Sequence, residues 1–381
     1  MRVYFDNAAT TPLCPVVVDA MTQCMLENYG NPSSIHAEGR KARALIEDAR
    51  KTVAHCMSAS IGEIFFTSGG TESNNTAIKC AVRDLDVTRI ITSQLEHHCV
   101  LHSVQSVEAF NKVLIEFVNV DETGKPDLQH LQELLSDRSH VTLVSLMHAN
   151  NEIGTLSDIK AIGELCKEYD AYFHSDSVQT VGHFPINVQE INVHFLSGAA
   201  HKFHGPKGIG FLYINNKVKI KPFLDGGAQE RNMRGGTENV YGIVGLAKAL
   251  QLAHDEYPER RKKIEEVRNY FRKKLVGNFD DVAFNGDVDG ESLYTVLNVS
   301  FPASSKSDLL LMILDISGVS ASGGSACSSG ADAGSHVLNH LPKCNKDRKS
   351  IRFSFSHYNT LEEVDFAIEK IKSILPQPVA I

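Results

Sequence analysis

The sequence contains no tryptophan, no CxxC pair and no hydrophobic run long enough to cross a membrane. The N-terminal stretch MRVYFDNAATTP carries no apolar signal segment, so we expect a cytoplasmic protein in which disulfides are not formed. Because the eight cysteines are scattered, neither a zinc site nor a dithiol redox motif is expected, and most of them should be small buried side chains.

An excess of positive charge is also absent. The chain carries 38 Lys and Arg against 46 Asp and Glu, a net charge of −8, which argues against a nucleic-acid-binding surface. The charged stretch that begins at Pro258 alternates in sign at helical spacing and is typical of a solvated helix face. The length of 381 residues indicates two domains or one large α/β domain.

Short apolar runs alternate with amphipathic helical stretches between about residues 15 and 260. The runs EIFFT, RIITS, VTLVSLM and AYFHSD are separated by helical patterns such as residues 37–57 and 158–169. This alternation predicts a mostly parallel sheet with helices on both faces. The segment NVHFLSGAAHKFHGPKGIGFLYIN differs, and it predicts two strands joined by a Gly- and Pro-rich crossing.

After Leu275 the pattern changes. YTVLNVSF and SIRFSFS predict strands, and SDLLLMILDIS and LEEVDFAIEKIKSIL predict helices, which together suggest a smaller α+β unit with a boundary near residues 255–265. This unit includes SASGGSACSSGADAG, residues 320–334, which is built almost wholly of Gly, Ala and Ser around Cys327. Small residues do not build a core, so we expect this thiol to be exposed on a mobile loop.

The segment SGGTESNN follows the first apolar run of the predicted sheet. Two glycines, a threonine hydroxyl and a helix start form a phosphate-binding arrangement, because backbone N–H groups and the positive helix end face the same point. Taken alone, the segment is equally typical of a helix N-capped by Thr71 or Ser73. It lacks both the GxxxxGK[ST] and the GxGxxG patterns.

Polar residues also follow the next three runs, in QLEHHCV, HANNEIG and SVQTVG. Any one of them is typical of a capped turn, but four successive polar strand ends indicate a shared site. Asp176 ends a hydrophobic run and needs a cationic partner, for which a pyridinium nitrogen is suitable. Lys202 in AAHKFHGPKG is either a surface lysine or a Schiff-base lysine. A phosphate cradle, a buried acid and such a lysine together predict a pyridoxal 5′-phosphate (PLP) site.

The chain resembles the cysteine desulfurases, class V aminotransferase-type enzymes of PLP fold type I. The matching segments, in chain order, are YFDNAATTP, GNPSSIHAEGR, FTSGGTESNN, EHHCVL, HANNEIG, HSDSVQ, HKFHGPKGIG, ERNMRGGTEN, SGGSACSSG and IRFSFS. The resemblance implies a large PLP-binding domain, residues 15–258, with a mostly parallel seven-stranded sheet flanked by helices. It also implies a smaller α+β domain, residues 1–14 and 259–381, that carries a long catalytic-cysteine loop at about 320–334.

The resemblance implies catalytic roles for four residues. Lys202 would hold PLP as an internal aldimine and take the α-proton of L-cysteine, while Asp176 would pair with the pyridine nitrogen. His97 would stack on the ring, and either His97 or the substrate thiol would act as proton acceptor. The thiolate of Cys327 would attack the substrate sulfur, giving L-alanine and a persulfide on Cys327.

The resemblance also implies binding residues, a homodimer and an acceptor. The phosphate ligands, with the last one supplied by the neighbouring subunit, would be Gly70, Thr71, His201 and Thr237. The phenolic oxygen and the substrate would be bound by Gln179, Asn151, Asn31 and Arg352, the arginine fork matching the substrate carboxylate. The persulfide sulfur would pass to an iron–sulfur scaffold, a tRNA-thiolation protein or another sulfur carrier, and no metal is expected in the site.

Two features depart from the family pattern. Ala199 stands where many relatives have a phosphate-binding serine, so one contact is missing or is replaced by Ser197 or a water. The SGADAG stretch after Cys327 is richer in glycine than in relatives, which predicts greater mobility. Two other readings remain: a selenocysteine lyase or other class V PLP enzyme in which Cys327 is incidental, and a scaffold that keeps the PLP fold without activity.

Overall fold

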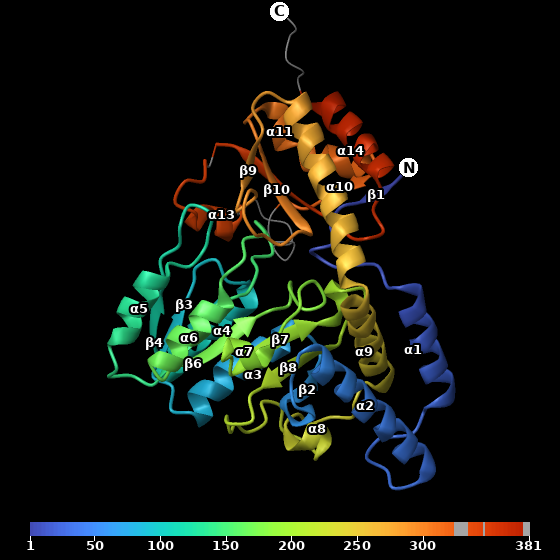
Figure 1. The fold of residues 1–381 in the computed structure, drawn as a ribbon, viewed down its shortest axis with the longest axis vertical. Coiled ribbons are helices and arrows are strands. Elements are labelled where there is room, and N and C mark those ends of the chain that lie inside the picture. Colours follow the sequence, from blue (N-terminus) through green and yellow to red (C-terminus); the bar gives the residue numbers. More distant parts are fainter. Residues whose placement is uncertain (324–333, 346, 376–381) are drawn as a thin grey trace, which may run out of the picture.

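The structure is a computed structural model that describes residues 1–323, 334–345 and 347–375. A small unit, drawn in orange and red, lies above a larger one, and a long helix runs from one to the other (Figure 1). Cys327 and the centre of the predicted catalytic loop lie outside the described residues.

The large unit is built on a seven-stranded sheet with the strand order β2-β8-β7-β6-β5-β3-β4. The strands are β2 (Ile64–Thr67), β3 (Arg89–Thr92), β4 (Leu114–Phe117), β5 (Thr142–Ser145), β6 (Tyr172–Asp176), β7 (Phe195–Ala199) and β8 (Gly210–Ile214). Of the seven strands, only β8 runs in the opposite direction to the rest, so the prediction of a mostly parallel seven-stranded sheet is confirmed.

Both faces of this sheet are covered by helices, which explains why its strands read as continuous apolar runs. On β5, Leu143 packs into the apolar cluster beneath α3 and α4, whereas Val144 packs into the cluster beneath α2, α6 and α9. The helices of the large unit are α1 (Pro15–Glu27), α2 (Ala37–Cys56), α3 (Gly70–Asp84), α4 (His98–Asn111), α5 (Leu128–Ser136), α6 (Ile159–Glu168), α7 (Val188–Ile191), α8 (Gln229–Asn232) and α9 (Val240–Asp255). Five cysteines are buried in this unit, as predicted for most of them.

The small unit has its own sheet and core. Strand β10 (Val296–Phe301) pairs antiparallel with β9 (Ala283–Asn285) and β12 (Lys349–Ser354). Helices α10 (Tyr257–Asn278) and α14 (Leu361–Ile374) cover this sheet, and α11 (Ser305–Asp308), α12 (Leu310–Ile316) and α13 (His336–His340) complete the unit. Its core includes Phe5 and Phe271, whose ring centroids are 5.8 Å apart.

The N-terminus belongs to the small unit, because β1 (Val3–Tyr4) pairs with β11 (Val319–Ser320). The apolar side chains of the small unit form a cluster separate from those of the large sheet. These observations support a division near residue 258, although the division into domains stays a prediction. No helix among the described residues is both long and apolar enough to span a membrane.

Candidate active site

A cavity of about 230 Å³ lies at the carboxyl ends of the large sheet, beside the small unit. Segments from distant parts of the sequence meet here, so the polar strand ends line one cavity. The predicted residues that line the cavity are Gly70, Thr71, His97, Asn151, Asp176, Gln179, His201, Lys202 and Arg352.

Two other predicted residues do not line this cavity. Asn31 is exposed in the loop before α2, where its side-chain oxygen accepts a hydrogen bond from the backbone N–H of Ser33 at 2.9 Å. Thr237 is exposed on the segment that leads into α9. A single chain therefore does not bring either residue to its own cavity, and their assigned roles stay predictions.

Asp176 ends β6 and is only 7% exposed. Its carboxylate accepts hydrogen bonds from the Asn74 side-chain amide at 2.7 Å and from the backbone N–H of Val178 at 3.0 Å. The Ser197 hydroxyl lies 3.5 Å from the same carboxylate. These neutral donors orient Asp176 toward the cavity without cancelling its charge, which suits a cationic ligand.

A buried relay behind Asp176 fixes the orientation of Asn74. His174 is fully buried, and burial lowers its pKa from 6.5 to about 4, so the imidazole is neutral. Its Nε2 lies 3.0 Å from the Asn74 oxygen and its Nδ1 lies 2.8 Å from the Ser145 hydroxyl. Because the Asn74 amide group donates to Asp176, its oxygen must accept from His174 Nε2–H. Asn74 was not predicted from sequence, although it lies one helical turn after Gly70 and on the same face of α3.

Lys202 follows β7 in a short 3₁₀ turn, Ala200–Lys202. Its ammonium group donates to the backbone oxygens of Ala8 at 2.6 Å and Ala9 at 2.9 Å. The Gln179 side-chain amide donates to the same Ala8 oxygen at 3.1 Å. The DNAATTP segment thus holds the lysine amine inside the cavity.

The N-terminus of α3 also lines the cavity, through Gly70 and Thr71. Gly69 is the N-cap residue, with a φ of 149° and no side-chain cap, so the alternative of a cap by Thr71 or Ser73 is wrong. The Ser73 hydroxyl instead bonds to Thr67 at 2.8 Å, inside the core. A Cβ atom on Gly70 would lie 2.5 Å from a Val178 methyl, so any other residue here would displace the Val178 side chain. The unpaired N–H groups of this helix end are suited to bind phosphate.

His97 is the N-cap of α4, where its Nδ1 accepts from the backbone N–H of Cys99 at 3.2 Å. Burial lowers the pKa of His97 below its ordinary value, although the charge of Asp176 opposes this shift. The imidazole is therefore neutral, with its proton on Nε2. The same cavity contains a thiol that was not predicted: burial, with a further contribution from Asp176, raises the pKa of Cys99 to about 12. Cys99 is consequently protonated and a poor nucleophile.

Arg352 lies on β12 of the small unit and is only 1% exposed. Its guanidinium donates to the backbone oxygen of Asn151 at 2.8 Å and to the carboxylate of Asp6 at 2.9 Å. Its Nε is buried and has no hydrogen-bond partner among the described residues. The guanidinium group is thus held in one orientation at the cavity. It still has N–H donors that are not used in these bonds, as binding of a carboxylate requires.

His201 and Ala199 complete the wall next to the lysine. His201 Nδ1 lies 3.2 Å from the Thr10 hydroxyl, and burial together with the nearby lysine charges lowers its pKa to about 4. Ala199 lines the cavity, whereas Ser197 does not and contacts Asp176 instead. Ser197 is therefore committed to the Asp176 end of the site, which argues against it as the substitute for a phosphate-binding serine.

Comparison with known proteins gives a consistent result. The model of the aminotransferase class-V family matches residues 3–366. A cysteine desulfurase IscS from Dictyoglomus turgidum is 44% identical over 377 residues, 98% of this chain and 94% of that protein. One from Clostridium botulinum is 40% identical over 99% of this chain and 95% of that protein.

Solved structures show the same similarity. A NifS-like protein that is 36% identical superimposes with a TM-score of 0.90 and covers 98% of this chain and 99% of its own. A NifS-like protein from Rickettsia africae, 32% identical, has a TM-score of 0.88 with the same coverage of both chains. The arrangement of the two units is therefore the one found in these proteins.

Proposed function

This chain belongs to the aminotransferase class-V family, and from that premise we infer that it is a PLP-dependent cysteine desulfurase. The observation that carries this inference is one cavity that combines the Lys202 amine, the buried Asp176 carboxylate and the N-terminus of α3. The substrate is L-cysteine, and its sulfur is transferred to an acceptor protein.

We propose that the Lys202 amine forms the covalent link to the cofactor and that Asp176 pairs with the ring nitrogen. Gly70, Thr71 and His201 would hold the phosphate, and Gln179 would contact the phenolic oxygen. The residues of the cavity fit PLP, because the Asp176 carboxylate can accept a hydrogen bond from the protonated ring nitrogen and the N–H groups at the start of α3 can donate to the phosphate. Bound PLP supplies an electron sink for bond cleavage next to the substrate α-carbon.

The substrate would be oriented by the small unit. Arg352 would bind the L-cysteine carboxylate with its free donor capacity, and Asn151 would lie beside it. The Lys202 amine, once released, would accept the α-proton, and the neutral His97 with its Nε2–H would cover the ring face. The anchored position of Arg352 keeps the substrate in one orientation relative to Lys202.

Sulfur transfer would take place at Cys327. Its thiolate would attack the substrate sulfur, the carbon–sulfur bond would break, and the carbon would be protonated to give L-alanine. The sulfur would remain on Cys327 as a persulfide, so atoms and electrons balance without an external oxidant. The high pKa of Cys99 argues against the other thiol of the cavity as the nucleophile.

We propose that the enzyme is a cytoplasmic homodimer in which Thr237 reaches the phosphate site of the second copy. Two observations support this. Thr237 is exposed away from its own cavity, and the packed helices α1 and α9 expose the apolar side chains of Val16, Leu26 and Tyr241. The final acceptor would be an iron–sulfur scaffold or another sulfur carrier, in keeping with the IscS names of the relatives.

Intact-mass analysis after incubation with L-cysteine tests this function. We expect a gain of one sulfur atom mapped to Cys327, together with formation of L-alanine. The variant Cys99→Ala should retain both products, whereas Cys327→Ala should lose the persulfide. Release of alanine at an unaltered rate by Cys327→Ala under reducing conditions would show that the proposed sulfur-transfer step is wrong.

A further inference from the structure

The backbone is strained directly before the segment that carries Thr237. The short element α8 is not a regular helix: Glu230, Arg231 and Asn232 within it have φ values of 43°, 57° and 65°, so three consecutive residues other than glycine adopt the left-handed conformation. Such residues are normally found singly, because the Cβ atom crowds the backbone. A conformation of this kind persists only where the surroundings impose it.

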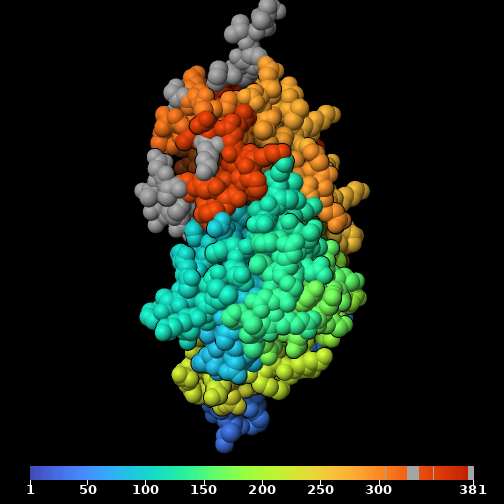
Figure 2. All heavy atoms as spheres, turned by 90° about the vertical axis from the view of Figure 1, so that its left-hand side faces the viewer, coloured from blue at the N-terminus to red at the C-terminus, as the bar shows by residue number. Residues whose placement is uncertain are grey.

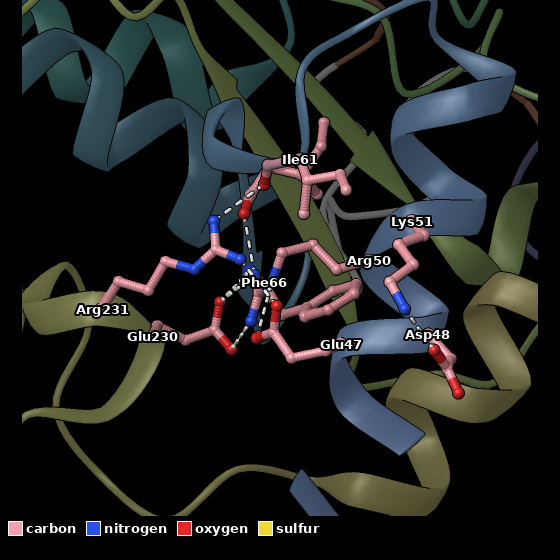
Figure 3. A network of polar contacts seen from close by, with 9 residues as sticks. Glu47, Asp48, Arg50, Lys51, Ile61, Phe66, Glu230 and Arg231 are labelled. Atoms are coloured by element: carbon pink, nitrogen blue, oxygen red, sulfur yellow. Dashed lines mark hydrogen bonds and ion pairs between the residues drawn. The ribbon is translucent and has the colours of Figure 1, made fainter. Parts of the chain in front are cut away.

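The carboxylate of Glu230 supplies the main constraint (Figure 3). It is 4% exposed and accepts from both terminal nitrogens of Arg50, at 2.7 and 2.9 Å, and from the backbone N–H of Phe66 at 2.8 Å. Arg50 is 1% exposed and also donates to the backbone oxygen of Ile64 at 2.8 Å. β2 is an edge strand of the large sheet, so its outward backbone groups have no neighbouring strand. Glu230 and Arg50 supply hydrogen-bond partners for two of these groups, the Phe66 N–H and the Ile64 oxygen.

Two further ion pairs hold residues that follow Glu230 in the chain. Arg231 contacts the half-exposed carboxylate of Glu47 at 2.6 Å, and the same carboxylate accepts from Arg50 Nε at 3.2 Å (Figure 3). Arg234 grips both carboxylate oxygens of Glu72, at 3.0 and 3.3 Å, and Glu72 directly follows the phosphate-site residue Thr71. Hydrogen bonds from Arg234 and Ser68 outweigh the effect of burial and lower the pKa of Glu72.

The far end of the segment is closed by backbone packing. The N–H of Gly235 donates to the backbone oxygen of Leu224 at 2.9 Å. A Cβ atom on Gly235 would lie 2.6 Å from the Cα of Gly226, so the two glycines are in close contact. Residues 224–236 therefore form a fixed turn that ends directly before Thr237.

We propose that Glu230 is a positioning residue that fixes the place from which Thr237 reaches the second copy. This proposal rests on the proposed function, in which Thr237 binds the cofactor phosphate across the dimer. A buried ion pair contributes little net stability compared with apolar packing, but it does select one geometry. Here the ion pair selects the strained turn. The chain runs from this turn directly to Thr237, so the position of the turn sets the position of Thr237.

A double-mutant cycle on PLP affinity tests the proposal. Apoprotein is reconstituted with PLP for the wild type, Glu230→Gln, Thr237→Ala and the double variant, and the dissociation constant is read from cofactor absorbance. We expect each single change to weaken PLP binding on the order of ten-fold, the value of about one hydrogen bond to a charged group. The double variant should be little weaker than either single variant, because both changes remove the same contact. Additive losses, or an unchanged affinity in either single variant, would overturn the proposal.

A mixed dimer separates this role from a general effect on folding. Glu230→Gln subunits are paired with Lys202→Ala subunits by means of two different tags, so the only covalent cofactor site belongs to the Glu230→Gln subunit. The turn that completes this site comes from the Lys202→Ala subunit and has an intact Glu230. We expect wild-type PLP affinity at this site, whereas an affinity as weak as in the Glu230→Gln homodimer would contradict the proposal.

Glu47→Gln is the matched control, because it removes a half-exposed carboxylate that pairs with the same Arg50, at Nε (3.2 Å), and with Arg231 (2.6 Å), while the bonds of Glu230 to Arg50 and Phe66 stay in place. Such pairs contribute little, so its PLP affinity should equal that of the wild type. If Glu230→Gln does not fold, Glu230→Asp serves instead, since its shorter side chain keeps the charge but cannot reach both Arg50 and Phe66. Formation of alanine by the wild type is measured in parallel, so that a failure of the proposed function is recognised separately.

Discussion

Arg352 is a side chain of the small unit that lines the cavity of the large sheet. It lies on the small unit, yet its hydrogen bonds run to Asn151 of the large unit and to Asp6. We expect Arg352→Lys to raise KM for L-cysteine on the order of 10- to 100-fold with a smaller change in kcat, because lysine keeps the charge but loses the fork. Steady-state alanine formation measures both constants.

Arg348→Lys is the control for this prediction. Arg348 lies just before the same strand, and its fork pairs with Asp281, whose side chain is 70% exposed, away from the cavity. Its KM should stay at the wild-type value. A fall in kcat alone for Arg352→Lys, with KM unchanged, would mean that the arginine does not bind the substrate carboxylate.

Asn74 lies beside Asp176 and fixes the polarity of its surroundings. Its amide group lies 2.7 Å from the Asp176 carboxylate, so Asn74→Asp places two carboxylates in contact in a buried site. One of them must then take up a proton, and the charge available to the ring nitrogen falls. We expect PLP binding to weaken on the order of ten-fold or more, measured by absorbance titration of the apoprotein. An affinity equal to that of the wild type would show that the relay through Asn74 does not tune Asp176.

At the scale of elements, the sequence predicted those features that depend on local pattern. The strands of the large sheet were recognised because both of their faces are buried, so residues such as Leu143 and Val144 form an unbroken apolar run. The polar strand ends then indicated the site. The N-cap at Gly69 was missed, since a cap made by the backbone of a glycine leaves no side-chain signal.

Partnerships between distant residues could not be predicted from the sequence. Arg50 and Glu230 are separated by 180 positions, and nothing in QERN announces a left-handed turn without glycine. The same holds for Asp6 with Arg352 and for Asn74 with Asp176, which are set by packing of whole elements. Such contacts fix the orientation of the side chains in the cavity. Local patterns therefore predicted which residues line the cavity, but not the hydrogen bonds that orient them.

Helix α13 offers a test of docking between elements. Figure 2 shows the red segment that contains it resting on the teal and green part of the chain, and Val337 and Leu341 pack there against Leu95 and Ile153. The hydroxyl of Ser335, the N-cap of this helix, donates to the fully buried carboxylate of Glu152.

We expect Ser335→Ala to lower the free energy of unfolding by about 1–2 kcal/mol, because it removes both a helix cap and the hydrogen bond to a buried carboxylate. Urea denaturation measures this loss. Ser373→Ala is the control, since the Ser373 hydroxyl bonds to the Lys370 backbone at an exposed position of α14. Equal stabilities for the two variants would mean that the contact with Glu152 does not hold α13.

At the scale of the whole molecule, the cavity exists only where the two units meet. Arg352 comes from the small unit, and Lys202 with Asp176 comes from the large sheet. The N-terminal segment joins them, because β1 pairs within the small unit while Ala8 and Ala9 bind the Lys202 amine. Chemistry at this site therefore depends on how firmly the units are held together, and a condition that loosens either unit should also impair the site.

Acid should be such a condition, because histidines are buried throughout the large unit. Burial lowers the pKa of His148, His174, His183 and His204 to about 4, from an ordinary value of 6.5. Between these values the unfolded chain binds more protons than the folded one, so stability rises with pH across this window and is fully present above about pH 6.5. For the fully buried His174, the shift corresponds to about 3 kcal/mol lost as the pH falls to about 4.

Urea unfolding of the holoenzyme at a series of pH values from about 7 to about 4, with PLP held saturating, tests this expectation. The midpoint should stay constant near neutrality and then fall steeply below about pH 6.5, with the steepest fall between pH 6 and 4. Ordinary carboxylates begin to be protonated only toward the lower end of this range. Burial raises the pKa of Glu96 well above 4.5, so its protonation stabilises the folded state as the pH falls. A loss that starts near pH 6 therefore identifies the histidines as its cause. A midpoint that stays level down to about pH 4.5 would mean that these imidazoles are already charged in the folded protein, and the neutral His174 of the Asp176 relay would then have to be abandoned.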